Sequence, residues 1–354
     1  MNGYLFHGAD VSYFSGKARP ALPQKGLHYT EVPPRMHEIM AKTGLAFIPV
    51  LVTPEGEYWQ DTSEILDRLE ERHPDPPLFP TTPVQRVVAY LIELYGDEIG
   101  VFPAMHYRWS FPESVAQARI DFASMSGNLE ASGRFADRMA GSLPFLGVNE
   151  ATIPAIEAHL RELLDALCAH FEEHAFLLGD QMSLADLGLM GPMYGHLYRD
   201  AVPSRLLRET AFRVCVWINR MNRPDPELQT GWLADDALAP TLLPVLRAMA
   251  DGVPVLVDAV RAIETWADDG ARAGETPERG VGMHETSLRN VPVQVGTRPY
   301  TLWMVQRVLD AYRSLSDAER GAVDTALAGT GFEPLLALEP RHRLGKQDNN
   351  LVWL

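Results

Sequence analysis

Two neighbouring side chains, Asp61 and Thr62, offer polar chemistry at the start of an amphipathic segment. A carboxylate in this position can hold an ammonium group through a charge-assisted hydrogen bond. A hydroxyl or a backbone N–H at the start of a helix can hold a carboxylate. The same residue types are also ordinary helix caps. The pair therefore predicts either a ligand site or a cap for the helix that begins near Ser63.

A second group of polar and aromatic side chains lies at residues 105–109 (MHYRW). Arg108 could meet an anionic group in a pocket, because its guanidinium matches the geometry of carboxylates and phosphates. Packing of these side chains at the end of a helix is the alternative. The residues themselves are His106, Tyr107, Arg108 and Trp109.

Metal and nucleotide sites have little support in the sequence. His170 and His174 have the i, i+4 spacing that metal ligands can use, but no third ligand is suggested and no HExxH motif occurs. The two cysteines are too few for a cysteine-rich zinc site or a disulfide framework. Neither GxGxxG nor GxxxxGK[ST] is present. We therefore expect no metal and no nucleotide cofactor.

The elements that must position these residues change character along the chain. Strands are expected at residues 3–7, 27–32 and 48–52, the last followed by a turn and a second short strand. Pro20 and Pro23 predict a short or kinked first helix. The prolines between residues 74 and 83 predict a linker. Helical periodicity then dominates. The expected helices cover 84–95, 114–140, 153–171, 205–222, 241–268, 299–314 and 316–328, and residues 269–299 are expected to form a loop with one strand near 291–295.

The composition limits the partners. The net charge is −16, and no basic stretch is available for nucleic acid or for an anionic membrane surface. No run of 18 apolar residues occurs, and the N-terminus does not have the pattern of a signal peptide. The sequence therefore predicts a cytoplasmic protein that binds neither nucleic acid nor membranes.

Several strings occur together in an order that resembles the glutathione S-transferase family. They are SYFSGKARPALPQKGLHYTEV, IPVLV, QDTSEILDRLEERHP and FLLGDQMSLADL. The resemblance covers residues 1–225. It implies a thioredoxin-like α/β domain over 1–80 and an all-helical domain over 81–230. Residues 231–354 would be a mostly helical C-terminal extension, and a homodimer is possible.

The resemblance also implies where glutathione would bind as co-substrate. Pro49 would be the cis-proline of the family, and the backbone of Ile48 would pair with the cysteinyl part of glutathione. Asp61 and Thr62 would hold the γ-glutamyl amine and carboxylate. The second-substrate pocket would lie between the domains, bordered by residues 106–109.

Ser12 matches the family position that faces the glutathione sulfur, and Tyr13 is the alternative hydroxyl. A hydroxyl that donates to a thiolate favours its ionisation. Ser12 or Ser15 could instead cap the first helix. Lys17 and Arg19 could lie near the glycyl carboxylate of glutathione, but we expect them to be solvated. Residues 1–80 contain no cysteine, so a mixed-disulfide mechanism is excluded there.

The expected function is attack by the glutathione thiolate on a small electrophile, with glutathione and a small hydrophobic molecule as partners. Two alternatives stay open. One is a non-catalytic binding or scaffold protein on the same fold, because a fold does not establish chemistry. The other is a glutathione-dependent lyase or isomerase for a specific metabolite.

Overall fold

The computed structural model describes residues 3–354 and begins with a small α/β unit. Its elements are β1 (Tyr4–His7), α1 (Tyr13–Ala18), α2 (Ala21–Gln24), β2 (Tyr29–Val32), α3 (Met36–Thr43), β3 (Val50–Val52), β4 (Tyr58–Gln60) and α4 (Thr62–Arg72). The prolines interrupt the first helix as expected, since α1 and α2 are separate. Helix α3 was not expected from the sequence, and Gly44 ends it in a left-handed conformation.

The four strands form one sheet in the order β2-β1-β3-β4, in which only β1 and β2 are parallel. Side chains alternate between its faces. Leu51 belongs to the main core with residues of α4, whereas Val50 and Val52 pack with Ile39 of α3. This sheet places the start of β3 and the start of α4 side by side, because Val50 is paired with Gln60.

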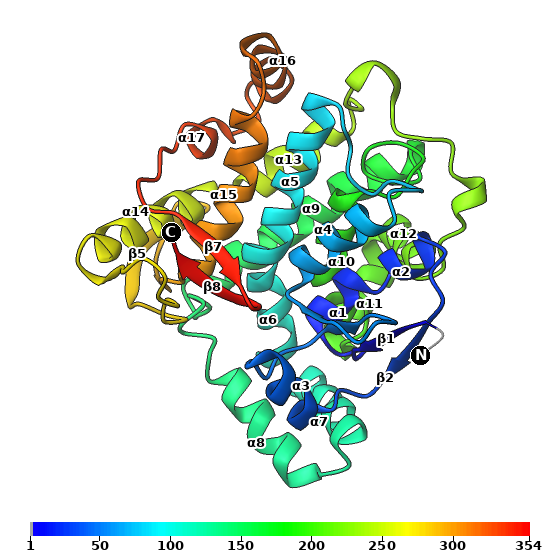
Figure 1. Ribbon diagram of the computed structural model, residues 1–354, viewed down its shortest axis with the longest axis vertical. Coiled ribbons are helices and arrows are strands. Elements are labelled where there is room, and N and C mark those ends of the chain that lie inside the picture. Colours follow the sequence, from blue (N-terminus) through cyan, green and yellow to red (C-terminus); the bar gives the residue numbers. More distant parts are fainter. Residues whose placement is uncertain (1–2) are drawn as a thin grey trace.

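Helices make up the next part of the chain (Figure 1). They are α5 (Pro83–Glu98), α6 (Val101–Trp109), α7 (Pro112–Ser126), α8 (Leu129–Ala140), α9 (Ile153–Glu173), α10 (Leu184–Pro192), a π-helical segment (Met193–Tyr198), α11 (Ala201–Thr210) and α12 (Phe212–Asn222). The single helix expected over 114–140 is wrong. Gly127, at φ 65°, ends α7 in the left-handed region that favours glycine.

The remaining residues form an extension that packs against α5. Its elements are two 3₁₀ turns (Pro226–Leu228 and Ala234–Asp236), α13 (Leu242–Ala250), α14 (Val253–Gly270), β5 (Met283–Leu288), β6 (Val291–Gly296), α15 (Pro299–Arg313), α16 (Asp317–Leu327), α17 (Glu333–Leu336), β7 (Leu344–Gln347) and β8 (Asn350–Trp353). The apolar face expected for residues 299–314 is buried. The region 269–299 contains two paired strands rather than the one expected.

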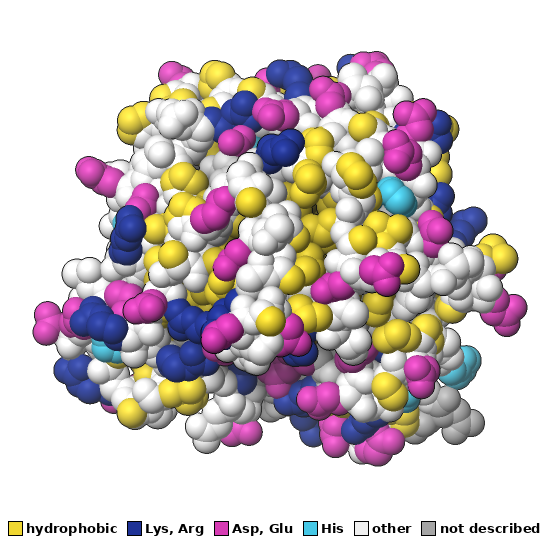
Figure 2. Space-filling view, turned by 90° about the horizontal axis from the view of Figure 1, so that it is seen from above, with side chains coloured by type: hydrophobic (Ala, Val, Ile, Leu, Met, Phe, Trp, Pro, Cys, Tyr) yellow, Lys and Arg dark blue, Asp and Glu magenta, His cyan; other side chains and the backbone are white. Residues whose placement is uncertain are grey.

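The three parts of the chain share one hydrophobic core, and α15 packs directly on α5. Arg307 of α15 donates to Asp67 of α4 at 3.1 Å and to Glu93 of α5 at 3.3 Å, which ties the extension to both other parts. Within residues 3–354, no helix is both long and apolar enough to cross a bilayer. Acidic and basic side chains are intermixed on the face shown in Figure 2.

Candidate functional site

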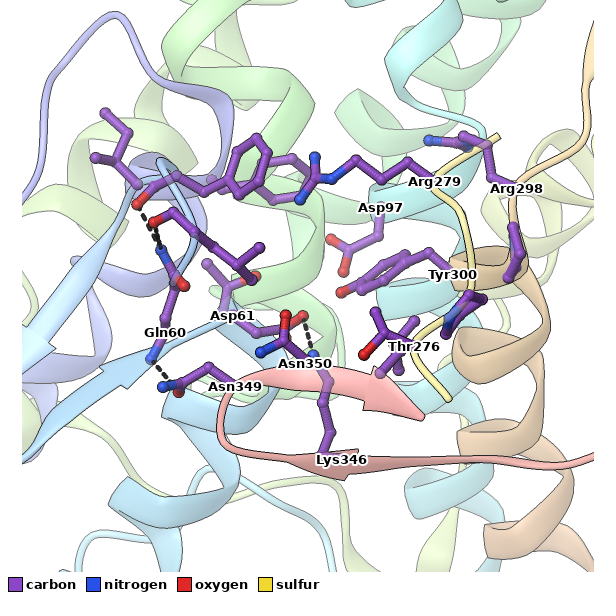
Figure 3. Close-up of a pocket in the computed structure, with 18 of the residues that line it drawn as sticks. Gln60, Asp61, Asp97, Thr276, Arg279, Arg298, Tyr300, Lys346, Asn349 and Asn350 are labelled. Atoms are coloured by element: carbon purple, nitrogen blue, oxygen red, sulfur yellow. Dashed lines mark hydrogen bonds and ion pairs between the residues drawn. The ribbon is translucent and has the colours of Figure 1, made fainter. Parts of the chain in front are cut away.

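A cavity of about 380 Å³ opens where the α/β unit, α5 and the extension meet (Figure 3). This volume lies within the range of small-molecule sites. Its walls come from segments that are far apart in the sequence. They include residues 45, 47–49, 60–62, 97–98, 276–279, 298–300 and 349–351, together with Phe14 and Lys346.

The structure brings Ile48, Pro49, Asp61 and Thr62 together at this cavity. The Ile48–Pro49 peptide bond is cis, and β3 begins directly after it. The pairing of β3 with β4 then places Asp61 and Thr62 beside it. These four residues, which the sequence analysis assigned to glutathione binding, are therefore neighbours in space.

Asp61 serves as a helix cap and as one member of an ion pair. Its Oδ1 accepts a hydrogen bond from the backbone N–H of Ser63 at 3.0 Å, as the cap of α4. Its Oδ2 accepts from the Lys346 ammonium at 2.9 Å. Its backbone is in an unusual conformation for a residue other than glycine, with φ 75°. The two sequence-based readings of Asp61, as cap and as partner of an ammonium, are compatible.

The hairpin of β7 and β8 forms one wall of the cavity and was not predicted. Its turn residue Asn349 accepts a hydrogen bond at Oδ1 from the backbone N–H of Gln60 at 3.3 Å. Leu344 and Trp353 lie at the base of the hairpin, and both side chains are buried. The hairpin thus brings Lys346 and Asn349 to the end of the edge strand β4.

Neither Ser12 nor Tyr13 is among the residues that line the cavity. Ser12 caps α1, and its Oγ accepts from the backbone N–H of Ser15 at 3.2 Å. The Tyr13 hydroxyl is buried and donates to the carbonyl of Gly96. Burial, with the negative charge of Asp97 nearby, raises the pKa of Tyr13 well above its usual value. Phe14 is the residue of this segment that reaches the cavity.

The four residues of α6 expected at a second-substrate pocket are buried away from this cavity. Arg108 donates through Nε to Asp200 at 2.7 Å and through Nη1 to the carbonyl of Val11 at 2.9 Å. His106 contacts Glu157 at 3.2 Å. Tyr107 and Trp109 stack on phenylalanine rings. The polar groups of Arg108 and His106 thus already have partners within the protein.

Lys17 is fully buried, so the expectation that it is solvated is wrong. Its ammonium lies 2.6 Å from Asp97 Oδ2 and 2.8 Å from Glu93 Oε1. Burial raises the pKa of Asp97 to about 7 despite this ammonium. Although burial opposes it, Lys17 and Arg307 lower the pKa of Glu93 to about 2. Arg19 is largely buried too and pairs with Glu31 at 2.8 Å.

Residues of the extension supply the part of the site that sequence reasoning missed. Arg298 donates to Glu98 Oε2 at 2.7 Å, and Arg279 lies over the ring of Phe47. Burial beside Asp61 and Asp97 raises the pKa of Tyr300 well above its usual value. These side chains carry no recognisable motif, because their relation to the cavity depends on contacts with the first hundred residues.

Two family profiles match separate parts of the chain, and the residues between these parts match neither. Residues 6–77 match the profile described as "Glutathione S-transferase, N-terminal domain". Residues 137–225 match the profile described as "Glutathione S-transferase, C-terminal domain". No curated protein has a significant match to the chain. The extension after residue 225 lies outside both profiles.

Solved structures with a similar fold are distant in sequence. A glutathione S-transferase from Methylobacterium radiotolerans, in complex with glutathione sulfonate, is 23% identical, covers 67% of this chain and 99% of its own, and has a TM-score of 0.41. A glutathione S-transferase from Rhodospirillum rubrum is 17% identical, with 68% and 97% covered and a TM-score of 0.43. The beta-etherase LigF from a Sphingobium strain is 16% identical, with 64% and 98% covered and a TM-score of 0.46.

Proposed function

The chain belongs to the glutathione S-transferase family, and from that premise we propose that it binds glutathione and directs its thiolate at a small electrophile. The observation that carries the proposal is the meeting of Ile48 and Pro49 with Asp61 and Thr62 at one cavity. In the proposed complex, glutathione lies along Ile48, with its γ-glutamyl end at Asp61 and Thr62.

The Lys346 ammonium donates a hydrogen bond to Asp61 Oδ2 in the structure. A ligand that binds at this oxygen therefore competes with Lys346. We propose that the γ-glutamyl ammonium replaces Lys346 at this oxygen. The exchange keeps the carboxylate paired, because one ammonium takes the place of another. Lys346 Nζ lies 4.5 Å from the centre of the Trp303 ring, which offers the released cation a second contact.

The proposed reaction is a substitution at carbon. The thiol of glutathione gives its proton to water, and the resulting thiolate sulfur forms a bond to the electrophilic carbon. The leaving group departs with the electron pair of the broken bond. The contribution of this chain would be to hold the two reactants together in a suitable orientation.

The proposal predicts opposite effects of two substitutions on glutathione affinity. Asp61→Ala should weaken binding about tenfold or more, because a hydrogen bond to a charged group is lost. Lys346→Met should strengthen binding, because the competing ammonium is gone. Calorimetric titration of both variants and the wild-type protein with glutathione measures these changes.

Glu71→Ala is the matched control, since Glu71 is an exposed carboxylate of the same helix, α4. It should bind glutathione like the wild-type protein. Undetectable glutathione binding by the wild-type protein would contradict the proposed function. Weaker binding by Lys346→Met would contradict the exchange of ammonium groups at Asp61.

A binding role without catalysis is the second candidate, and the contacts of Ser12 favour it. Ser12 Oγ accepts from Ser15, and the residue does not line the cavity. If Ser12 stabilises the thiolate in the complex, Ser12→Ala should lower kcat about tenfold or more while changing the Kd for glutathione little. A steady-state assay with glutathione and an aryl halide measures kcat. Unchanged kcat in Ser12→Ala would remove this role, and no turnover by the wild-type protein would favour the binding role.

A further inference from the structure

Arg279 is a cation of the extension that faces the cavity without a carboxylate partner among residues 3–354. The other two extension cations at the cavity, Arg298 and Lys346, pair with Glu98 and Asp61. The guanidinium carbon of Arg279 lies 3.5 Å from the centre of the Phe47 ring. Burial lowers the pKa of Arg279, and no neighbouring carboxylate offsets this shift. The guanidinium therefore packs on an aromatic ring and has no carboxylate partner among the described residues, although Arg279 as a whole is exposed.

The surroundings of Arg279 differ from those of Asp61. Phe47 directly precedes Ile48, and Phe14 and Leu45 also line the cavity. Figure 3 shows the side chain of Arg279 reaching across one side of the cavity, whereas Lys346 and Asn349 approach from the other. One side thus combines the ring of Phe47 with a cation that has no carboxylate partner among residues 3–354, and the other combines paired polar groups.

An apolar wall with one unpaired guanidinium fits a ligand of matching chemistry. Aromatic surface stacks on rings such as Phe47, which is 42% exposed. A guanidinium binds carboxylate, sulfonate or phosphate groups through paired N–H donors. Glu278 lines the same cavity but forms no ion pair with Arg279 that would compete for these donors.

We infer that the second substrate is an apolar, aromatic electrophile that bears an anionic group, and that Arg279 binds this group. The inference rests on the proposed function only for the reaction itself, since binding of such a molecule can be measured without glutathione. Arg279 would then determine which electrophiles the site accepts.

The test compares two unreactive probes of nearly equal shape, 2-naphthoate and 2-naphthamide, of which only the first is charged. Fluorescence titration of the wild-type protein should give a Kd at least about tenfold lower for the naphthoate, as expected for one charge-assisted interaction. Arg279→Gln should remove this preference. Arg272→Gln is the control, because Arg272 is exposed in the same connection and donates only to backbone carbonyls.

Each other result has a defined meaning. A preference for naphthoate that persists in Arg279→Gln, or that is absent from the wild-type protein, would overturn the inference. So would a loss of glutathione affinity in Arg279→Gln with unchanged naphthoate binding, which would place a carboxylate of glutathione on Arg279. Selective naphthoate binding by a protein that does not bind glutathione would leave this inference standing and refute the proposed function alone.

Discussion

Replacing Lys17 by methionine should lower the free energy of unfolding by about 3–5 kcal/mol. The ammonium of Lys17 is fully buried between Asp97 and Glu93, and it also donates to Ser63 at 2.9 Å. Its removal leaves two buried carboxylates without this ammonium, and Arg307 is then the main positive charge that offsets their negative charge. Urea denaturation of the variant and the wild-type protein measures the difference.

The loss should grow as the pH rises through about 7, where Asp97 gives up its proton in the wild-type protein. Without Lys17, folded Asp97 keeps its proton to a higher pH than it does in the folded wild-type protein, whereas the two unfolded chains titrate alike at this residue. The stability of the variant therefore falls more steeply with pH. Lys42→Met is the control, because Lys42 is exposed, and it should change stability little. An equally small loss in Lys17→Met would refute the buried network.

Replacing Arg108 by methionine should cost a similar amount, about 3–5 kcal/mol. The guanidinium of Arg108 is buried against Asp200 with two hydrogen bonds, at 2.7 and 3.0 Å. It also donates to the carbonyls of Val11 and Gly195, which joins the segment before Ser12 to the helical part of the chain. The variant leaves the Asp200 carboxylate buried and unpaired. Its thermal midpoint, compared with that of the wild-type protein, reports the cost.

Arg134→Met provides the comparison for Arg108. Arg134 pairs with Glu130 on the surface of α8, where both side chains are mostly exposed. Exposed pairs contribute about 0–1 kcal/mol, so this variant should unfold almost like the wild-type protein. An Arg108→Met variant with an unchanged thermal midpoint and a raised KM for an anionic electrophile would contradict this prediction. That result would indicate that Arg108 binds substrate.

The fold class could be predicted because its signals are local. The strings around Pro49 and Asp61 each specify a strand or a helix start, and pairing of β3 with β4 follows from a short connection. The capping box of Ser183 and Asp186 is equally local, since the Ser183 N–H donates to Asp186 at 3.0 Å. Sequence patterns of this kind report interactions within a few residues.

The rest of the site depends on contacts that local patterns do not report. Asp61 and Lys346 are 285 residues apart, and Arg307 meets Asp67 across 240 residues. Residues 106–109 were assigned to a pocket because the family resemblance implies that this region borders one and because their types suit it. The same types also suit a core in which polar groups have partners, and only the fold distinguishes these cases.

One missed element did carry a signal. The segment around Asp348 and Asn349 lies between two short runs with apolar residues, and both residues have positive φ. Asp and Asn favour such two-residue turns between antiparallel strands. Arg289 and Asn290 form the corresponding turn between β5 and β6. This turn pattern is therefore typical of a hairpin such as that of residues 344–353.

The distance in sequence between Asp61 and Lys346 also sets an order of events during synthesis. At about 5–20 residues per second, the ribosome adds the 285 residues that separate them in about 15–60 s. N-terminal domains fold first, so the Asp61 carboxylate reaches its place at the end of β4 before its partner exists. During that interval, the Asp61 carboxylate lacks the Lys346 ammonium with which it pairs in the finished chain.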